Sequence, residues 1–68
     1  MNKLAERLKE LRKDNGLTLK QISSALSIPL ETYANYEHGI RKPPIDLIIA
    51  ICNYYDVTAD YLIGRTDY

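Results

Sequence analysis

Two short helical segments with a brief interruption between them set the tightest limit on the architecture of this chain. Thr18 and Gln21 have the spacing of a capping box, in which a hydroxyl and an amide each bond to the other residue's backbone N–H at a helix start. The helix is expected to run from Leu19 to about Leu26. The segment Ser27-Ile28-Pro29 should then end it, because proline cannot continue a helix but suits the first turn of the next one.

A second short helix is expected from Leu30 to His38, closed by Gly39. In such a pair the second helix stands across the first, and Ile28 is the apolar side chain predicted to fill the turn. Two short helices cannot bury a core alone, so the rest of the chain must supply it. Caps and apolar spacing predict three further helices, from residue 2 or 3 to 14, over 45–55 and over 59–63. No strand pattern competes, so we predict a single all-α domain over residues 1–68.

Composition argues against several functional classes. Cys52 is the only cysteine and His38 the only histidine, so neither an intrachain disulfide nor a metal site is expected. No apolar run reaches the length of a membrane span, and the N-terminal residues lack a signal-peptide core, so we predict a cytoplasmic protein. The sequence shows neither a catalytic nucleophile with a general base beside it nor a glycine-rich loop that could bind phosphate. An enzyme, a cofactor and a small-molecule ligand are therefore not predicted.

The helix over 45–55 is apolar nearly all round, which is typical of a central helix or one at an interface. Its expected core face consists of Ile45, Ile48, Ile49 and Cys52. Formal charge is zero overall but is distributed unevenly, with +3 over residues 1–20, 0 over 21–44 and −3 over 45–68. This polarity is a weak indication of an anionic partner.

Many residues at fixed offsets resemble the phage repressor and Cro family, also called the xenobiotic-response-element (XRE) family. They are Gly16-Leu17-Thr18, Ile22, Leu26, Ile28, Thr32-Tyr33, Asn35-Tyr36-Glu37, Gly39, Arg41-Lys42-Pro43 and the run from Val57 to Leu62. The resemblance covers nearly the whole chain. It implies a five-helix lambda-repressor-like domain whose second and third helices form a helix-turn-helix that binds double-stranded DNA. Leu19 departs from the family, which usually has a glutamine there to position the recognition helix.

The resemblance implies that the helix over 30–38 enters the major groove with its N-terminal residues on base edges. The candidate base contacts are Pro29, Leu30, Glu31, Ala34 and Asn35. Asn35 can pair bidentately with adenine, and Glu31 can accept from a cytosine amino group. Leu30 and Ala34 can pack against thymine methyls. The alternative is that these are ordinary solvated residues of a surface helix.

Phosphate contacts would fix the register of the protein on the duplex. The candidates are Thr18, the backbone amides at Leu19 and Lys20, and the side chains of Lys20, Thr32, Tyr36, His38, Arg41 and Lys42. Arg12 and Glu37 match a pair that forms a partly buried ion pair in the family, which would hold the recognition helix on the core. Two exposed charges are the alternative for that pair.

The leading hypothesis is a transcriptional regulator, a repressor that binds a palindromic operator as a homodimer, at least on DNA. The candidate dimer contacts are Leu47, Ile51, Tyr54, Tyr55 and Tyr61, each of which could instead be ordinary core. The rival hypothesis is a protein-interaction module, such as an antitoxin-like or adaptor protein, with weak or no DNA binding. Net neutrality, six tyrosines and the apolar residues Leu19, Leu30 and Ile40 on the presumed DNA face suit that rival.

Overall fold

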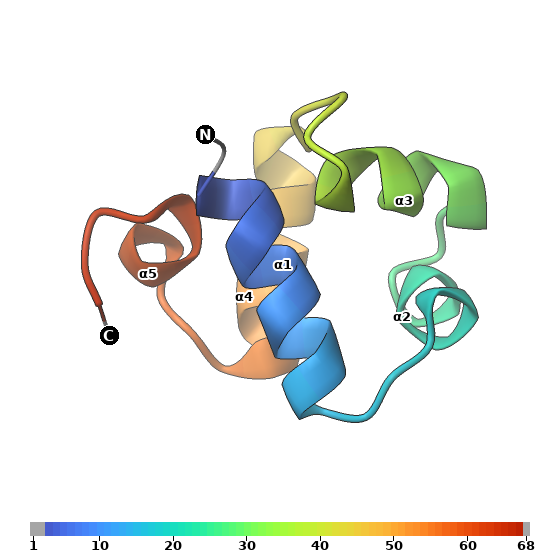
Figure 1. Ribbon diagram of the computed structural model, residues 1–68, viewed down its shortest axis with the longest axis horizontal. Helices are drawn as coiled ribbons and strands as arrows, with labels where there is room; N and C mark the ends of the chain where they lie inside the picture. The colour runs from blue at the N-terminus through green and yellow to red at the C-terminus, as the bar shows by residue number, and fades with distance from the viewer. Residues whose placement is uncertain (1–2, 68) are drawn as a thin grey trace.

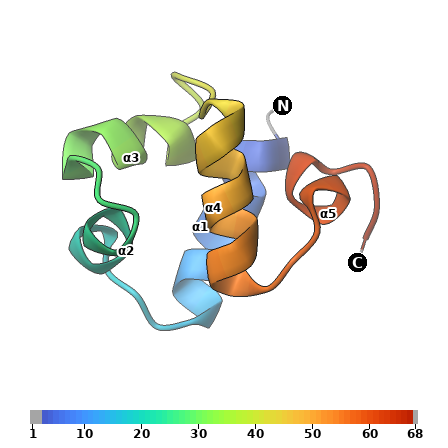
Figure 2. The ribbon, with the colours of Figure 1, turned by 180° about the vertical axis from the view of Figure 1, so that it is seen from behind.

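Five helices and their connections make up the computed structural model, which describes residues 3–67 (Figure 1). The helices are α1 (Lys3–Asp14), α2 (Leu19–Ala25), α3 (Leu30–Glu37), α4 (Ile45–Tyr55) and α5 (Ala59–Ile63). The described residues contain no strand, as predicted. Helices α1 and α4 lie in the middle, with α2 and α3 on one side and α5 on the other (Figures 1 and 2). Helices α2 and α3 end one residue earlier than expected, because Leu26 and His38 are their C-cap residues.

The turn between α2 and α3 has the expected signals at both ends. Thr18 Oγ1 accepts from the Gln21 amide at 3.1 Å, and Gln21 Oε1 accepts from the Thr18 amide at 2.8 Å, which completes the capping box. After α2, the Ile28 amide donates to the Ser23 carbonyl at 3.0 Å. Ser27 has a φ of 59° there, a left-handed conformation that turns the chain sharply toward α3. The Ile28 side chain packs against the core, as predicted.

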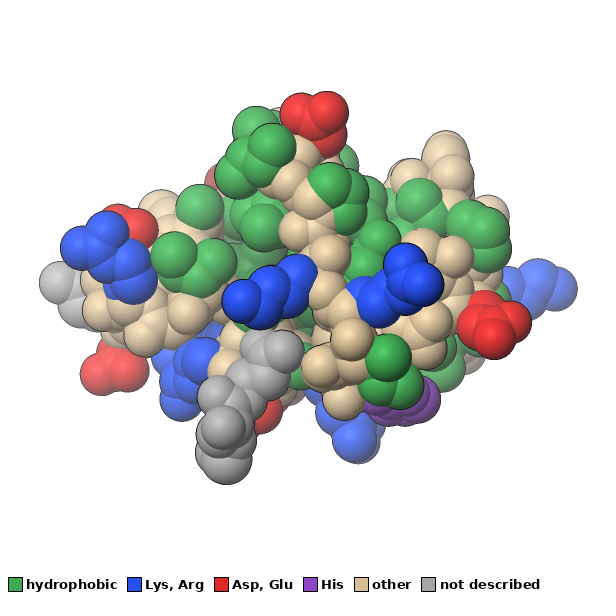
Figure 3. Space-filling model, turned by 90° about the horizontal axis from the view of Figure 1, so that it is seen from above, with side chains coloured by type: hydrophobic (Ala, Val, Ile, Leu, Met, Phe, Trp, Pro, Cys, Tyr) green, Lys and Arg blue, Asp and Glu red, His purple; other side chains and the backbone are tan. Residues whose placement is uncertain are grey.

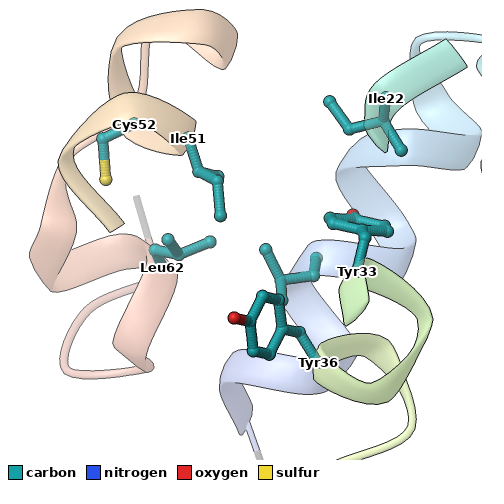
Figure 4. Close-up of a cluster of buried hydrophobic side chains, with 7 residues drawn as sticks. Ile22, Tyr33, Tyr36, Ile51, Cys52 and Leu62 are labelled. Carbon is teal, nitrogen blue, oxygen red and sulfur yellow. The ribbon is translucent and has the colours of Figure 1, made fainter. Parts of the chain in front are cut away.

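The core draws side chains from all five helices. Its buried members are Leu8, Ile22, Tyr33, Tyr36, Ile51, Cys52 and Leu62. Figure 4 shows Ile22 of α2 with Tyr33 and Tyr36 of α3 on one side, and Ile51 and Leu62 pointing toward them from α4 and α5. Helix α3, the candidate recognition helix, is therefore anchored in the core by the rings of Tyr33 and Tyr36. That attachment leaves its opposite face available to solvent.

The orientation of α4 differs from the one predicted. Ile45 and Ile49 were expected in the core, but they are 68% and 53% exposed. Cys52 is buried and Ile48 is partly buried against the core, as predicted, but Ile51, which was expected on another side of the helix, is also buried. Because α4 has apolar residues nearly all round, its sequence alone did not determine which side would meet α1 and α5. The helix therefore presents isoleucines to solvent.

The side chain of Arg7 holds α5 and the residues after it against α1, a contact that the sequence did not suggest. Arg7 is 6% exposed. Its Nη1 donates to the carbonyls of Tyr61 at 2.8 Å and Thr66 at 3.3 Å, and its guanidinium lies 4.0 Å from the centre of the Tyr61 ring. Asp67 and Glu10 lie 3.8 and 4.0 Å from its nitrogens. This buried cation is thus satisfied by carbonyls at the end of α5 and by nearby carboxylates.

Candidate nucleic-acid interface

Helix α3 lies at the surface with two contrasting faces. Tyr33, Tyr36 and Glu37 point inward and are buried. On the opposite face Leu30, Glu31 and His38 are exposed, while Thr32, Ala34 and Asn35 are partly exposed. The five candidate base contacts, Pro29, Leu30, Glu31, Ala34 and Asn35, are therefore all accessible at least in part. An α-helix presented in this way has the size and shape that fit a DNA major groove.

A polar groove of about 380 Å³ runs along one flank of α3. It is lined by Pro29, Glu31, Thr32, Asn35, Tyr36 and Arg41. Three of the candidate base contacts (Pro29, Glu31 and Asn35) and three of the candidate phosphate contacts (Thr32, Tyr36 and Arg41) thus line the same groove. Leu30 and Ala34 do not line this groove. The candidate residues therefore divide into a polar flank and an apolar flank of the same helix.

The loop after α3 places Arg41 beside this groove. The carbonyl of Asn35 accepts hydrogen bonds from the amides of Ile40 at 3.0 Å and Arg41 at 3.3 Å. Gly39, with a φ of 75°, provides the left-handed turn that lets the loop fold back over the end of α3. The Asn35 carboxamide itself makes no hydrogen bond among the described residues. Its donor and acceptor are thus available to a ligand.

Three exposed cations around α2 and α3 have no carboxylate partner within residues 3–67: Lys20, Arg41 and Lys42. Figure 3 shows Lys and Arg side chains on the face seen from above. Thr18 is exposed, although its hydroxyl already accepts the bond of the capping box. The amides of Leu19 and Lys20 occupy the first two positions of α2, where a helix offers no internal acceptor. His38 is also exposed at the end of α3.

Tyr36 was a candidate phosphate contact, but the structure places it mainly in the core. Only 8% of the residue is exposed, at the point where it lines the groove. Its ring belongs to the same cluster as Leu8 and Ile51. The side chain therefore serves first to attach α3 to the scaffold.

The predicted ion pair between α1 and α3 is present and bidentate. Arg12 Nε lies 2.7 Å from Glu37 Oε2, and Nη2 lies 3.2 Å from Oε1. Nη1 also donates to the Leu17 carbonyl at 3.0 Å. The side chains of Arg12 and Glu37 are 14% and 3% exposed, and the hydrogen bond to Glu37 raises the pKa of Arg12 against the opposing effect of burial. This contact fixes the C-terminal turn of α3 to α1 and to the segment before α2.

Ile51 was one of the five candidate dimer contacts, but it is completely buried in the core, so that prediction is wrong. Leu47 and Tyr55 are partly buried and pack on the core, and Tyr61 is partly covered by Arg7. Tyr54 is 47% exposed. The sequence prediction missed other exposed apolar side chains on α4 and α5, which are Ile45, Ile49 and Ile63. The orientation of α4 described above accounts for Ile45 and Ile49.

Comparisons with known proteins agree with this geometry. A model of the helix-turn-helix domain family matches residues 5–67. The chain is 38% identical to the HTH-type transcriptional regulator ImmR of Bacillus subtilis, over 94% of this chain and 50% of that protein. It is 32% identical to the cryptic phage CTXphi transcriptional repressor RstR of Vibrio cholerae, over 93% of this chain and 56% of that protein.

A solved structure shows the same fold. It is the crystal structure of a transcriptional regulator from Listeria innocua, which superposes with a TM-score of 0.88 at 34% identity and covers 94% of this chain and 60% of that one. This chain spans about half the length of the curated relatives it matches. The family and the fold are those of transcriptional regulators and not of enzymes. The resemblance to the phage repressor and Cro proteins is thus confirmed, and this chain belongs to the helix-turn-helix domain family.

Proposed function

We propose that this chain binds double-stranded DNA sequence-specifically and represses transcription as a dimer on a palindromic operator. The observation that supports this most directly is the unpaired Asn35 carboxamide on the outer face of α3, next to Arg41 in a polar groove. A carboxamide in the major groove pairs bidentately with adenine. Bound protein would repress by occluding RNA polymerase, which requires no chemistry. The relative named a transcriptional repressor supports that direction of control.

The rigid support of α3 favours DNA recognition over a merely solvated surface. Direct readout requires side chains held at a fixed distance from the base edges. The Arg12–Glu37 pair and the buried rings of Tyr33 and Tyr36 fix three positions of α3 on the scaffold. Lys20, Arg41 and Lys42 would meet phosphates on either side of the groove and hold the register.

Selection from random duplex DNA, followed by sequencing, tests this proposal and gives the half-site. We expect an enriched inverted repeat that contains adenine at one position contacted by Asn35. Asn35→Ala should weaken binding to the enriched duplex by about 1–3 kcal/mol and leave binding to random duplex unchanged. Asn53→Ala, an exposed asparagine of α4, is the matched control and should change neither.

Equal losses for Asn35→Ala on both duplexes would show that Asn35 does not contact a base. Selection that enriches no sequence, even at low salt, would reject sequence-specific binding altogether.

A protein partner for the same face is the second candidate function. Leu30 is 45% exposed and Ile40 is 69% exposed, and both lie at the presumed DNA face. Exposed apolar side chains at a protein surface can mark a protein contact. If that face binds protein, Leu30→Ser and Ile40→Ser should abolish capture of the partner, while duplex DNA should not compete for it.

A further inference from the structure

The outer face of α3 carries apolar and acidic side chains next to each other near the N-terminal end of the helix. Around the helix the order is Leu30, Ala34, Glu31 and Asn35. Residues three or four positions apart are neighbours on a helix surface, so the Ala34 methyl lies between the side chains of Leu30 and Glu31. Leu30 is 45% exposed, Glu31 is exposed and Ala34 is partly exposed. This end of α3 lies at the edge of the molecule opposite α5 (Figures 1 and 2), so the three side chains can contact one ligand together.

The Glu31 carboxylate needs a hydrogen-bond donor if a duplex covers it. It lines the polar groove and makes no ion pair with a cation of residues 3–67. In a major groove the base donors are the amino groups of adenine and cytosine. Adenine has the N7 acceptor beside its amino group, which repels a carboxylate, whereas cytosine offers its N4 amino group alone. Glu31 therefore favours cytosine.

The apolar side chains beside Glu31 favour a methyl group on that cytosine. In the cytosine ring C5 is bonded to C4, which carries the amino group, so a carboxylate at the amino group places Leu30 and Ala34 near C5. Unmodified cytosine has only a hydrogen there, while thymine and 5-methylcytosine carry a methyl group. Thymine, the base expected from the sequence to meet Leu30 and Ala34, has the O4 acceptor in place of the amino group, and a carboxylate repels it. Of these three pyrimidines, only 5-methylcytosine suits all three side chains.

We propose that α3 recognises 5-methylcytosine, and that methylation of one cytosine in the half-site strengthens binding. The inference rests on the proposed function, because it assigns a base to the same face of α3. Glu31 accepts a hydrogen bond from the N4 amino group, and Leu30 and Ala34 cover the C5 methyl group. Removing one methyl-sized apolar group from water corresponds to about fourfold in affinity. The methylation state of the DNA thereby sets how much of it is occupied at a given protein concentration.

Synthetic duplexes that carry the selected half-site test this inference. Each cytosine of the half-site is replaced in turn by 5-methylcytosine or, with its paired base, by thymine, and binding is followed by fluorescence anisotropy. At one position the order of affinity should be 5-methylcytosine, cytosine, thymine. The expected steps are about fourfold between the first two and at least about fivefold between the last two. A 5-methylcytosine outside the half-site is the matched control and should have no effect.

Two variants separate the contact to the amino group from the contact to the methyl group. Glu31→Gln should abolish the preference for cytosine over thymine, because a carboxamide can donate to O4 as well as accept, and it should keep the gain from methylation. Leu30→Ala should remove most of the gain from methylation and keep the preference for cytosine over thymine. Asp46→Asn, at an exposed carboxylate of α4, is the comparison variant and should change neither ratio. Far-UV circular dichroism verifies that each variant is folded.

Equal affinity for cytosine and 5-methylcytosine at every position of the half-site would overturn the inference, as would tighter binding of thymine than of 5-methylcytosine. So would a half-site without cytosine, or a gain from methylation that Leu30→Ala leaves intact. If Glu31 only stabilises the start of α3, Glu31→Gln would lower the melting temperature and leave the preference for cytosine over thymine unchanged, which also overturns the inference. All of these results leave the proposed function standing. Failure to enrich any duplex would count against the proposed function itself.

Discussion

Removal of Arg12 should lower the free energy of unfolding of this domain by a large share. The change leaves a buried carboxylate without its ion-pair partner. The Glu37 side chain is only 3% exposed, and each of its two carboxylate oxygens accepts a hydrogen bond from the Arg12 guanidinium. Arg12→Ala removes these two bonds and the one to the Leu17 carbonyl. Truncating one partner of a buried ion pair costs about 3–5 kcal/mol, much more than the net contribution of the pair.

That loss is large for a chain of this size. At about 0.05–0.15 kcal/mol per residue, 68 residues give a free energy of unfolding of roughly 3–10 kcal/mol. A change of 1 kcal/mol shifts the melting temperature of such a domain by about 4–8 °C. The Arg12→Ala variant should therefore melt at least about 12 °C below the wild type, and it is unfolded at 25 °C if the wild type lies at the lower end of the range.

Urea denaturation followed by far-UV circular dichroism measures this difference. Lys13→Ala removes an exposed cation from the next position of α1 and should change stability by less than about 0.5 kcal/mol. Replacing both partners, as Arg12→Met with Glu37→Met, should recover most of the loss, because no charge is then left unpaired. A cost below about 1 kcal/mol for Arg12→Ala, or a double variant no more stable than Arg12→Ala, would refute the argument from burial.

Three further results are expected. Lys42→Ala should weaken specific and random duplex equally and reduce the slope of log affinity against log salt by about 0.9, whereas Lys9→Ala on α1 should do neither. Burial raises the pKa of Tyr55 from 10.0 to about 12. The stabilisation from keeping this hydroxyl neutral is therefore complete below pH 10 and is lost as the pH rises toward 12. Tyr55→Phe should flatten the fall in the free energy of unfolding, measured by denaturation, across that range. Arg7→Ala should speed amide hydrogen exchange in α5 more than in α2 and α3, because Arg7 binds the Tyr61 carbonyl, and equal changes in all helices would contradict a local role.

The helices were predictable from sequence because local interactions determine them. The Thr18 and Gln21 side chains that form the capping box are three residues apart, and the break before α3 depends on Pro29 itself. The Arg12–Glu37 pair was also anticipated, but only through the family resemblance, since nothing local links residues 25 positions apart.

Features that depend on tertiary contacts were not predictable in the same way. Arg7 has the sequence environment of a solvated helix residue, and its burial arises only because the end of α5 returns to α1. The exposed face of α4 was misassigned because Ile45 and Ile51 are equally apolar, and only packing against the other helices distinguishes them. Arg41 enters the groove because its amide binds the Asn35 carbonyl, a contact made by a loop without periodicity.

Surface charge, rather than total charge, explains how a neutral chain can approach DNA. The excess of +3 over residues 1–20 includes Arg7 and Arg12, and both are engaged by carboxylates within the fold. The cations without such partners that flank the groove are Lys20, Arg41 and Lys42, which come from α2 and the loop after α3. The acidic excess belongs to residues 45–68, which form α4, α5 and the segment after them. An anionic duplex would therefore be attracted to the α2 and α3 side by these three cations, which would help to orient the protein before any base is contacted.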